Sequence, residues 1–197
     1  MNRVLINLVL FKAGWLACVM LAAADRPALA TLAVAAVVVV HLLRVAVPVK
    51  EALFLLAAAL IGLAWESFLL STGLLQYPES SQSGTWAPHW IVAMWVLFAT
   101  TINHGLEWVK RNWMLSAAMG MIGGPMAFWA GSGMGAVSFG DPALALLAIG
   151  AGWALLLPLL ALLSDTITDS AFLEPMSSAG SDRKAGPDLE KYRGQII

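Results

Sequence analysis

Charge is scarce in this sequence. Asp, Glu, Lys and Arg make up only 12% of the 197 residues, which is about half the usual share in soluble domains. Eleven basic residues face twelve acidic ones, so the chain has no basic surface for nucleic acid. The single cysteine, Cys18, precludes an intrachain disulfide, and no Cys/His cluster supports a structural zinc site. These shortages exclude a disulfide-stabilised scaffold, a nucleic-acid-binding protein and an ordinary soluble domain.

Apolar residues are correspondingly abundant. They account for 60% of the chain, and the mean hydropathy is +0.80. A membrane-spanning helix needs about 20 mostly apolar residues. We therefore predict an all-α polytopic membrane protein, a bundle of six transmembrane helices. The six segments are residues 4–23, 27–48, 51–72, 89–109, 113–135 and 143–163.

Two polar stretches interrupt or follow these segments. The connection over residues 73–88 has the composition of a loop, and residues 164–197 are rich in Ser, Asp, Gly and Lys. Such a composition buries too little apolar surface to order itself. We expect a transmembrane bundle over residues 1–163 and a largely disordered cytoplasmic tail over residues 164–197.

The predicted orientation follows from lysine and arginine in the short connections, because these residues collect on the cytoplasmic side. Outside the tail, one side carries five of them and the other carries only Arg26. This bias predicts a multi-pass membrane protein with both termini in the cytoplasm. The five are Arg3, Arg44, Lys50, Lys110 and Arg111.

The fourth predicted helix carries a polar stripe. Thr100, Asn103 and Glu107 recur at spacings of three and four residues, so they would share one helical face. His104 lies beside them and is a natural titrating group at neutral pH. The stripe indicates either hydrogen bonding between helices or a polar pocket that binds a head group or moves a proton.

Glu66 and Ser67 lie deep in the third predicted helix. Glu66 would lie about 22 Å from the cytoplasmic end, in the outer half of the bilayer. A carboxyl group at this depth is protonated, paired or wetted by a cavity. Lys12 is a conceivable partner, although lysine usually extends toward its own interface.

Gly123, Gly124 and Pro125 predict a break near the middle of the fifth helix. Proline removes a backbone donor, and in lipid the freed carbonyl must be satisfied by a neighbour or by water. The break implies either a kink with close packing or a broken helix lining a cavity. We expect Glu66 and the Asn103/His104 face to point into one partly wet cavity with this break in its wall.

No motif indicates a metal or a cofactor. His41, His104 and Glu107 could in principle ligate a metal, but no HExxH or similar spacing supports this. We therefore expect no metal and no cofactor.

Several motifs together resemble a known family. They are Phe11-Lys12-Ala13-Gly14-Trp15, Trp65-Glu66-Ser67, Phe98 to His104, and Gly123-Gly124-Pro125. The sequence is similar to a family of small bacterial inner-membrane proteins catalogued as a domain of unknown function. The resemblance implies no established activity, and it associates the family with enzymes that modify fatty acyl chains.

Three functions remain open at this point. The first is a membrane protein that binds a lipid or another amphipathic ligand in a polar intramembrane cavity and acts with a lipid-modifying partner protein. The second is an intramembrane enzyme acting on lipid acyl chains or head groups, with His104 or Glu66 as general base. The third is a small proton-coupled transporter, against which the lack of an inverted repeat argues. The candidate ligand-binding residues are Glu66, Ser67, Thr100, Asn103, His104 and Glu107.

Overall fold

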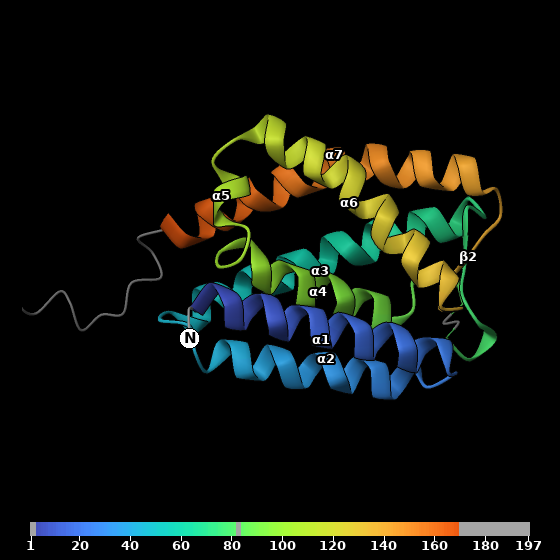
Figure 1. Ribbon diagram of the computed structural model, residues 1–197, viewed down its shortest axis with the longest axis horizontal. Coiled ribbons are helices and arrows are strands. Elements are labelled where there is room, and N and C mark those ends of the chain that lie inside the picture. Colours follow the sequence, from blue (N-terminus) through green and yellow to red (C-terminus); the bar gives the residue numbers. More distant parts are fainter. Residues whose placement is uncertain (1–2, 82–83, 170–197) are drawn as a thin grey trace, which may run out of the picture.

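The computed structural model describes residues 3–81 and 84–169. These residues form an all-helical fold with two very short strands, as Figure 1 shows. A 3-10 turn, Glu79–Ser81, lies between α3 and α4. The elements are α1 (Arg3–Ala23), α2 (Pro27–Leu42), α3 (Pro48–Ser71), β1 (Leu75–Gln76), α4 (His89–Ile102), α5 (Glu107–Lys110), α6 (Trp113–Gly133), β2 (Ser138–Phe139) and α7 (Pro142–Asp169).

Three helices of the described chain are long and apolar enough to cross a membrane. They are Val4–Ala23, Pro48–Ser71 and Pro142–Asp169, while α2 and α4 are shorter apolar helices. Large apolar side chains on several helices point outward rather than into the bundle, which is typical of a surface that faces lipid. Examples are Leu32, Leu60, Leu147, Leu155 and Leu162. The prediction of an all-α membrane protein is confirmed at this level, and the predicted number of six spans is not.

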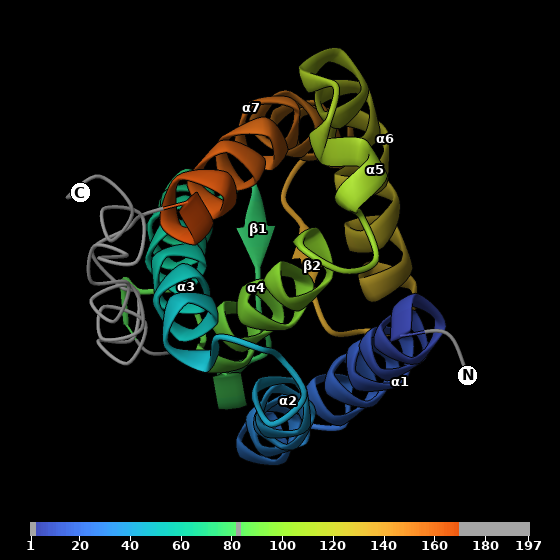
Figure 2. The same cartoon turned by 90° about the vertical axis from the view of Figure 1, so that its left-hand side faces the viewer.

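The long helices pack as three sequential hairpins, and α4, a member of the second, lies at the centre of the bundle. The hairpins are α1 with α2, α3 with α4, and α6 with α7, and α4 also contacts α1, α2 and α7. Figure 2 views this bundle along its length and shows α4 inside a ring formed by the other long helices. The strands β1 and β2 pair antiparallel, with Leu75 opposite Phe139, and join the connection after α3 to the connection before α7. This pairing closes one end of the bundle.

The fourth helix ends earlier than the sequence predicts. It stops at Ile102, and the N–H groups of His104, Gly105 and Leu106 all donate to the carbonyl of Thr101 in a tight turn. Gly105 lies so close to α1 that a Cβ there would be 2.6 Å from Leu8 Cδ2. A side chain at this position would require Leu8 to move, so glycine suits the close approach of this turn to α1. The predicted helix over residues 89–109 is therefore wrong beyond Ile102.

Pro125 does not interrupt α6. The helix runs continuously from Trp113 to Gly133 with Pro125 inside it. Proline frees the carbonyl four residues earlier, that of Met121. This carbonyl lies against α7 at Gly150, where a Cβ would be 3.1 Å from Met121 O. Close helix packing thus shields the freed carbonyl from lipid. The helix is not broken at Gly123-Gly124-Pro125, and of the two alternatives the structure shows the close packing.

The last helix continues beyond the predicted end of the bundle. It reaches Asp169 rather than residue 163, and Ser164 is fully buried. Lys110 Nζ lies 2.6 Å from Asp165 Oδ1, and Lys50 Nζ donates to the Thr168 carbonyl at 2.7 Å. These contacts place residues 164–169 in the folded part of the chain. The rest of the predicted tail lies outside the described residues.

Candidate functional site

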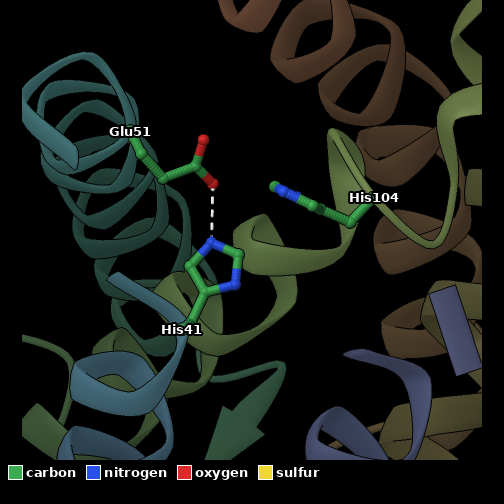
Figure 3. A group of neighbouring side chains, drawn as sticks. All are labelled: His41, Glu51 and His104. Carbon is green, nitrogen blue, oxygen red and sulfur yellow. Dashed lines mark hydrogen bonds and ion pairs between the residues drawn. The ribbon is translucent and has the colours of Figure 1, made fainter. Parts of the chain in front are cut away.

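Three side chains that can bind a metal or exchange a proton meet at one end of the bundle. They are His41, Glu51 and His104, shown in Figure 3. His41 Nε2 lies 2.9 Å from Glu51 Oε1. One ligand atom from each of the three residues lies within 4.8 Å of those from the other two. We call these three residues the histidine–glutamate cluster.

Local structure explains why residues so far apart in sequence meet. His41 lies in the last turn of α2, and Glu51 lies in the first turn of α3. Pro48 begins α3 and suits a first helical turn because its missing N–H would be unpaired there anyway. The short reversal between the two helices therefore stacks His41 beside Glu51. His104 reaches the same point from the turn that ends α4.

A second set of polar side chains supports the cluster. Asn103 Nδ2 donates to Glu51 Oε2 at 3.2 Å. Lys110 Nζ donates to Asn103 Oδ1 at 2.7 Å, which orients the amide so that its NH₂ group faces Glu51. Ser164 of α7 also donates to Asn103 Oδ1. Four helices and the turn after α4 thus hold one polar network at this end.

Burial determines the chemical character of the cluster. His41 and Glu51 are only 6% and 7% exposed, and the two histidine rings meet edge to face with centroids 5.0 Å apart. Burial lowers the pKa of His104 below its usual value, although the Glu51 carboxylate opposes this effect. His104 Nδ1 is buried and makes no hydrogen bond within the described structure. The cluster therefore presents a neutral imidazole nitrogen beside a carboxylate.

Glu66 belongs to a different and fully buried group. Its carboxylate accepts hydrogen bonds from the Tyr77 hydroxyl at 3.0 Å and from Trp95 Nε1 at 2.9 Å. Burial, reinforced by the Glu66 carboxylate, raises the pKa of Tyr77 well above its usual value, so this hydroxyl stays protonated and donates. Gly62 makes room for Trp95, because a Cβ there would lie 2.3 Å from Trp95 Cγ.

The structure separates the residues that the sequence predicted to share one cavity. Glu51 and Glu66 lie fifteen residues apart on α3, or about 22 Å at the rise of an α-helix. His104 therefore faces Glu51 and not Glu66. Among the described residues Lys12 forms no ion pair with Glu66, whose hydrogen-bond partners are Tyr77 and Trp95. Lys12 Nζ instead lies 5.3 Å from the ring centroid of Trp15. The prediction of a single cavity shared by Glu66 and the Asn103/His104 face is wrong.

The remaining predicted site residues have local partners. The Thr100 hydroxyl donates to Leu97 O, and Ser67 Oγ accepts the N–H of Ala87. Glu107 lies on α5, exposed, where Arg111 Nη2 is 3.2 Å from its carboxylate. Because α4 ends at Ile102, Glu107 does not share a face with Thr100 and Asn103. The predicted polar stripe is thus wrong as a continuous helical feature.

The structure instead contains a large apolar cavity of about 560 Å³ between α1, α4, α6 and α7. Gly123 and Gly124 lie in its wall, and so do Tyr77 and Trp95, the partners of Glu66. Lys12 on α1 is the charged residue of the lining. The large apolar members of the wall include Phe11, Trp15, Met94, Phe98, Phe128 and Trp153. Glu66 thus lies behind the cavity wall rather than in it.

Sequence reasoning missed the roles of Glu51, Tyr77 and Trp95. In the sequence, Glu51 looks like an ordinary polar residue at the start of a helix. Only its position ten residues after His41, with Pro48 between them, could have indicated that the two side chains pair. Tyr77 lies in a polar connection whose path the sequence does not specify. Trp95 is one of nine tryptophans, a residue type that ordinarily marks the membrane interface.

An all-helical membrane protein with an apolar cavity between its helices is the class that the fold and the site define. The chain belongs to the family described as Protein of unknown function (DUF2878), whose model matches residues 4–159. Membership in a family of unknown function, expected from the motifs, is thereby confirmed. No curated protein and no solved structure matches the chain.

Proposed function

We propose that this protein is a multi-pass protein of the bacterial inner membrane that holds the acyl chain of an amphipathic lipid in its apolar cavity. The observation that carries the proposal is the cavity of about 560 Å³ between α1, α4, α6 and α7. Its volume falls within the range of about 300–1,000 Å³ that is typical of small-molecule sites. Acyl chains surround the bundle in a bilayer, so the ligand reaches the cavity without crossing water.

Lys12 gives the cavity a charge preference. Its side chain is exposed, lines the cavity and lies over the Trp15 ring. An ammonium group in the wall of an apolar cavity attracts the negative head group of a lipid whose chain lies inside. We therefore propose an anionic, single-chain or double-chain lipid as the ligand, which the protein passes to a lipid-modifying partner protein.

The test is mass spectrometry of lipids that remain bound to the full-length protein after purification in mild detergent. Gly123 lines the cavity and has no heavy atom within 4 Å of an added Cβ. The Gly123→Phe variant should therefore fill the cavity without disturbing the fold and should lose bound lipid. Gly133, on the same helix, is equally open and does not line the cavity, so Gly133→Phe is the matched control.

The outcomes separate the candidate functions. Anionic lipid retained by the wild type and by Gly133→Phe, but lost by Gly123→Phe, supports the proposal. Equal retention by all three proteins contradicts it. Chemical conversion of the added lipid by the purified protein would instead identify an intramembrane enzyme.

A further inference from the structure

The histidine–glutamate cluster is chemically independent of the apolar cavity, because none of its three residues lines the cavity. Two imidazoles and one carboxylate form a recurrent donor set for Zn²⁺ and for non-haem Fe²⁺. We propose that His41, Glu51 and His104 bind one divalent transition-metal ion at this end of the bundle. The sequence suggested Glu107 as the carboxylate ligand, and no metal was expected because no motif spacing supported one. In the structure Glu51, not Glu107, lies beside the two histidines.

The distances suit a metal site after small adjustments, in which His41 and Glu51 separate by a few tenths of an ångström and His104 moves closer. Bonds of about 2.0–2.1 Å with tetrahedral angles put ligand atoms about 3.3 Å apart. His41 Nε2 and Glu51 Oε1 are 2.9 Å apart, and the widest separation within the cluster is at most 4.8 Å. His104 lies on a turn and is only partly buried, so a small movement of this residue completes the site.

The surroundings of the cluster resemble the outer shell of a metal site. Metal-bound carboxylates are usually held by a further hydrogen bond, and Asn103 Nδ2 donates to Glu51 Oε2 while Oε1 faces the histidines. Lys110 is a cation near the cluster, and Asp165 at 2.6 Å neutralises it. The buried Nδ1 of His104, which makes no hydrogen bond, shows that the cluster leaves this imidazole incompletely satisfied.

The donor types also limit the choice of ion. Ca²⁺ and Mg²⁺ prefer sites built from oxygen ligands, whereas this cluster offers two nitrogens and one carboxylate. Three protein ligands leave at least one coordination position open for water or substrate. The rival interpretation is a simple buried ion pair between His41 and Glu51, with His104 packed against it.

The experiment is titration of the purified full-length protein with Co²⁺ after treatment with a chelator. Co²⁺ reports low coordination number and nitrogen ligation through its visible absorption, and Zn²⁺ should displace it. We expect about one ion per chain. Replacement of any ligand, as in His41→Ala, Glu51→Gln or His104→Ala, should weaken binding by more than about 100-fold, since even outer-shell changes cost about 10–100-fold.

The chain provides a matched control and a safeguard against unfolding. His89, the third histidine, lies at the other end of the bundle and hydrogen-bonds to Thr31, so His89→Ala should bind Co²⁺ like the wild type. His104→Gln changes the partly exposed ligand and keeps a polar side chain if the buried His41 variant does not fold. Absence of a Co²⁺ spectrum in the wild type, or equal binding by His104→Gln, overturns the proposal.

Discussion

At the scale of single residues, Glu66 combines an ionisable carboxyl group with complete burial. The side chain is completely buried, and its two oxygens accept from Tyr77 and Trp95. Removing the acceptor would leave two buried donors unsatisfied, each at a cost of about 1–3 kcal/mol. The three side chains therefore form one unit that ties α3, α4 and the connection after α3 together.

This geometry predicts different losses of stability for two substitutions of Glu66. Glu66→Gln keeps one carbonyl oxygen and should lower the melting temperature in detergent only slightly. Glu66→Leu removes both acceptors and should destabilise the fold by about 2–4 kcal/mol. Glu107→Leu removes an exposed carboxylate and serves as the control. Equal melting temperatures for Glu66→Gln and Glu66→Leu would show that the two hydrogen bonds contribute little.

The charge of Lys12 leads to a second prediction at this scale. If the ammonium group selects anionic lipid at the cavity, Lys12→Gln should lower the anionic share of co-purified lipid while the total bound lipid stays similar. Lys12→Arg keeps the charge and should retain the wild-type preference. The measurement is quantitative lipid mass spectrometry, and an unchanged head-group distribution in Lys12→Gln would remove Lys12 from the site.

At the scale of helices, the contact between α3 and α4 depends on Gly62. Trp95 lies directly over this glycine, where a Cβ would lie 2.3 Å from Trp95 Cγ. Gly62→Ala should push Trp95 away from Glu66 and destabilise the fold by about 1–3 kcal/mol, despite the better helix propensity of alanine. Gly123→Ala adds its Cβ to open space and should not lower the melting temperature. Equal behaviour of the two variants would contradict the proposed fit.

The end of α7 provides another prediction at this scale. Deletion of residues 174–197 leaves every described contact of α7 intact and should not change the melting temperature. Deletion of residues 164–197 also removes the buried Ser164, the Asp165 partner of Lys110 and the Thr168 carbonyl. The longer deletion should therefore lower the melting temperature, and similar values for both would show that residues 164–169 add nothing to the fold.

The helices also show how far sequence patterns extend. Long apolar runs are local, so α1, α3 and α7 were predicted with their starts within a few residues. The end of α4 depends on how closely Gly105 approaches Leu8 of α1, which no pattern within one helix contains. The prediction of the site was wrong for the same reason. His104 and Asn103 were recognised as polar residues in an apolar chain, but their meeting with Glu51 depends on the turn between α2 and α3.

At the scale of the whole molecule, the lengths of the shorter helices constrain how the bundle sits in a bilayer. The central helix α4 has 14 residues and α2 has 16, which correspond to about 21 Å and about 24 Å. The hydrocarbon core is about 30 Å thick. Surrounding helices contact α4 on several sides, so a central helix shorter than the hydrocarbon core has its ends covered by protein.

Orientation is the property of the whole molecule that reporter fusions can test directly. Lys50, Lys110 and Arg111 lie at the end of the bundle that holds the histidine–glutamate cluster, whereas Arg26 lies at the opposite end. Because cytoplasmic loops are enriched in lysine and arginine, we expect the cluster to lie on the cytoplasmic side.

Reporter domains fused after Gln82 and after Gly180 should then report the outer and the cytoplasmic side, respectively. Replacing Lys50 and Lys110 with glutamine should weaken this preference, whereas Arg26→Gln should not. The six-span arrangement places three spans between the two fusion sites, so the fusions must report opposite sides. If both report the same side, the arrangement with six spans and two cytoplasmic termini is wrong.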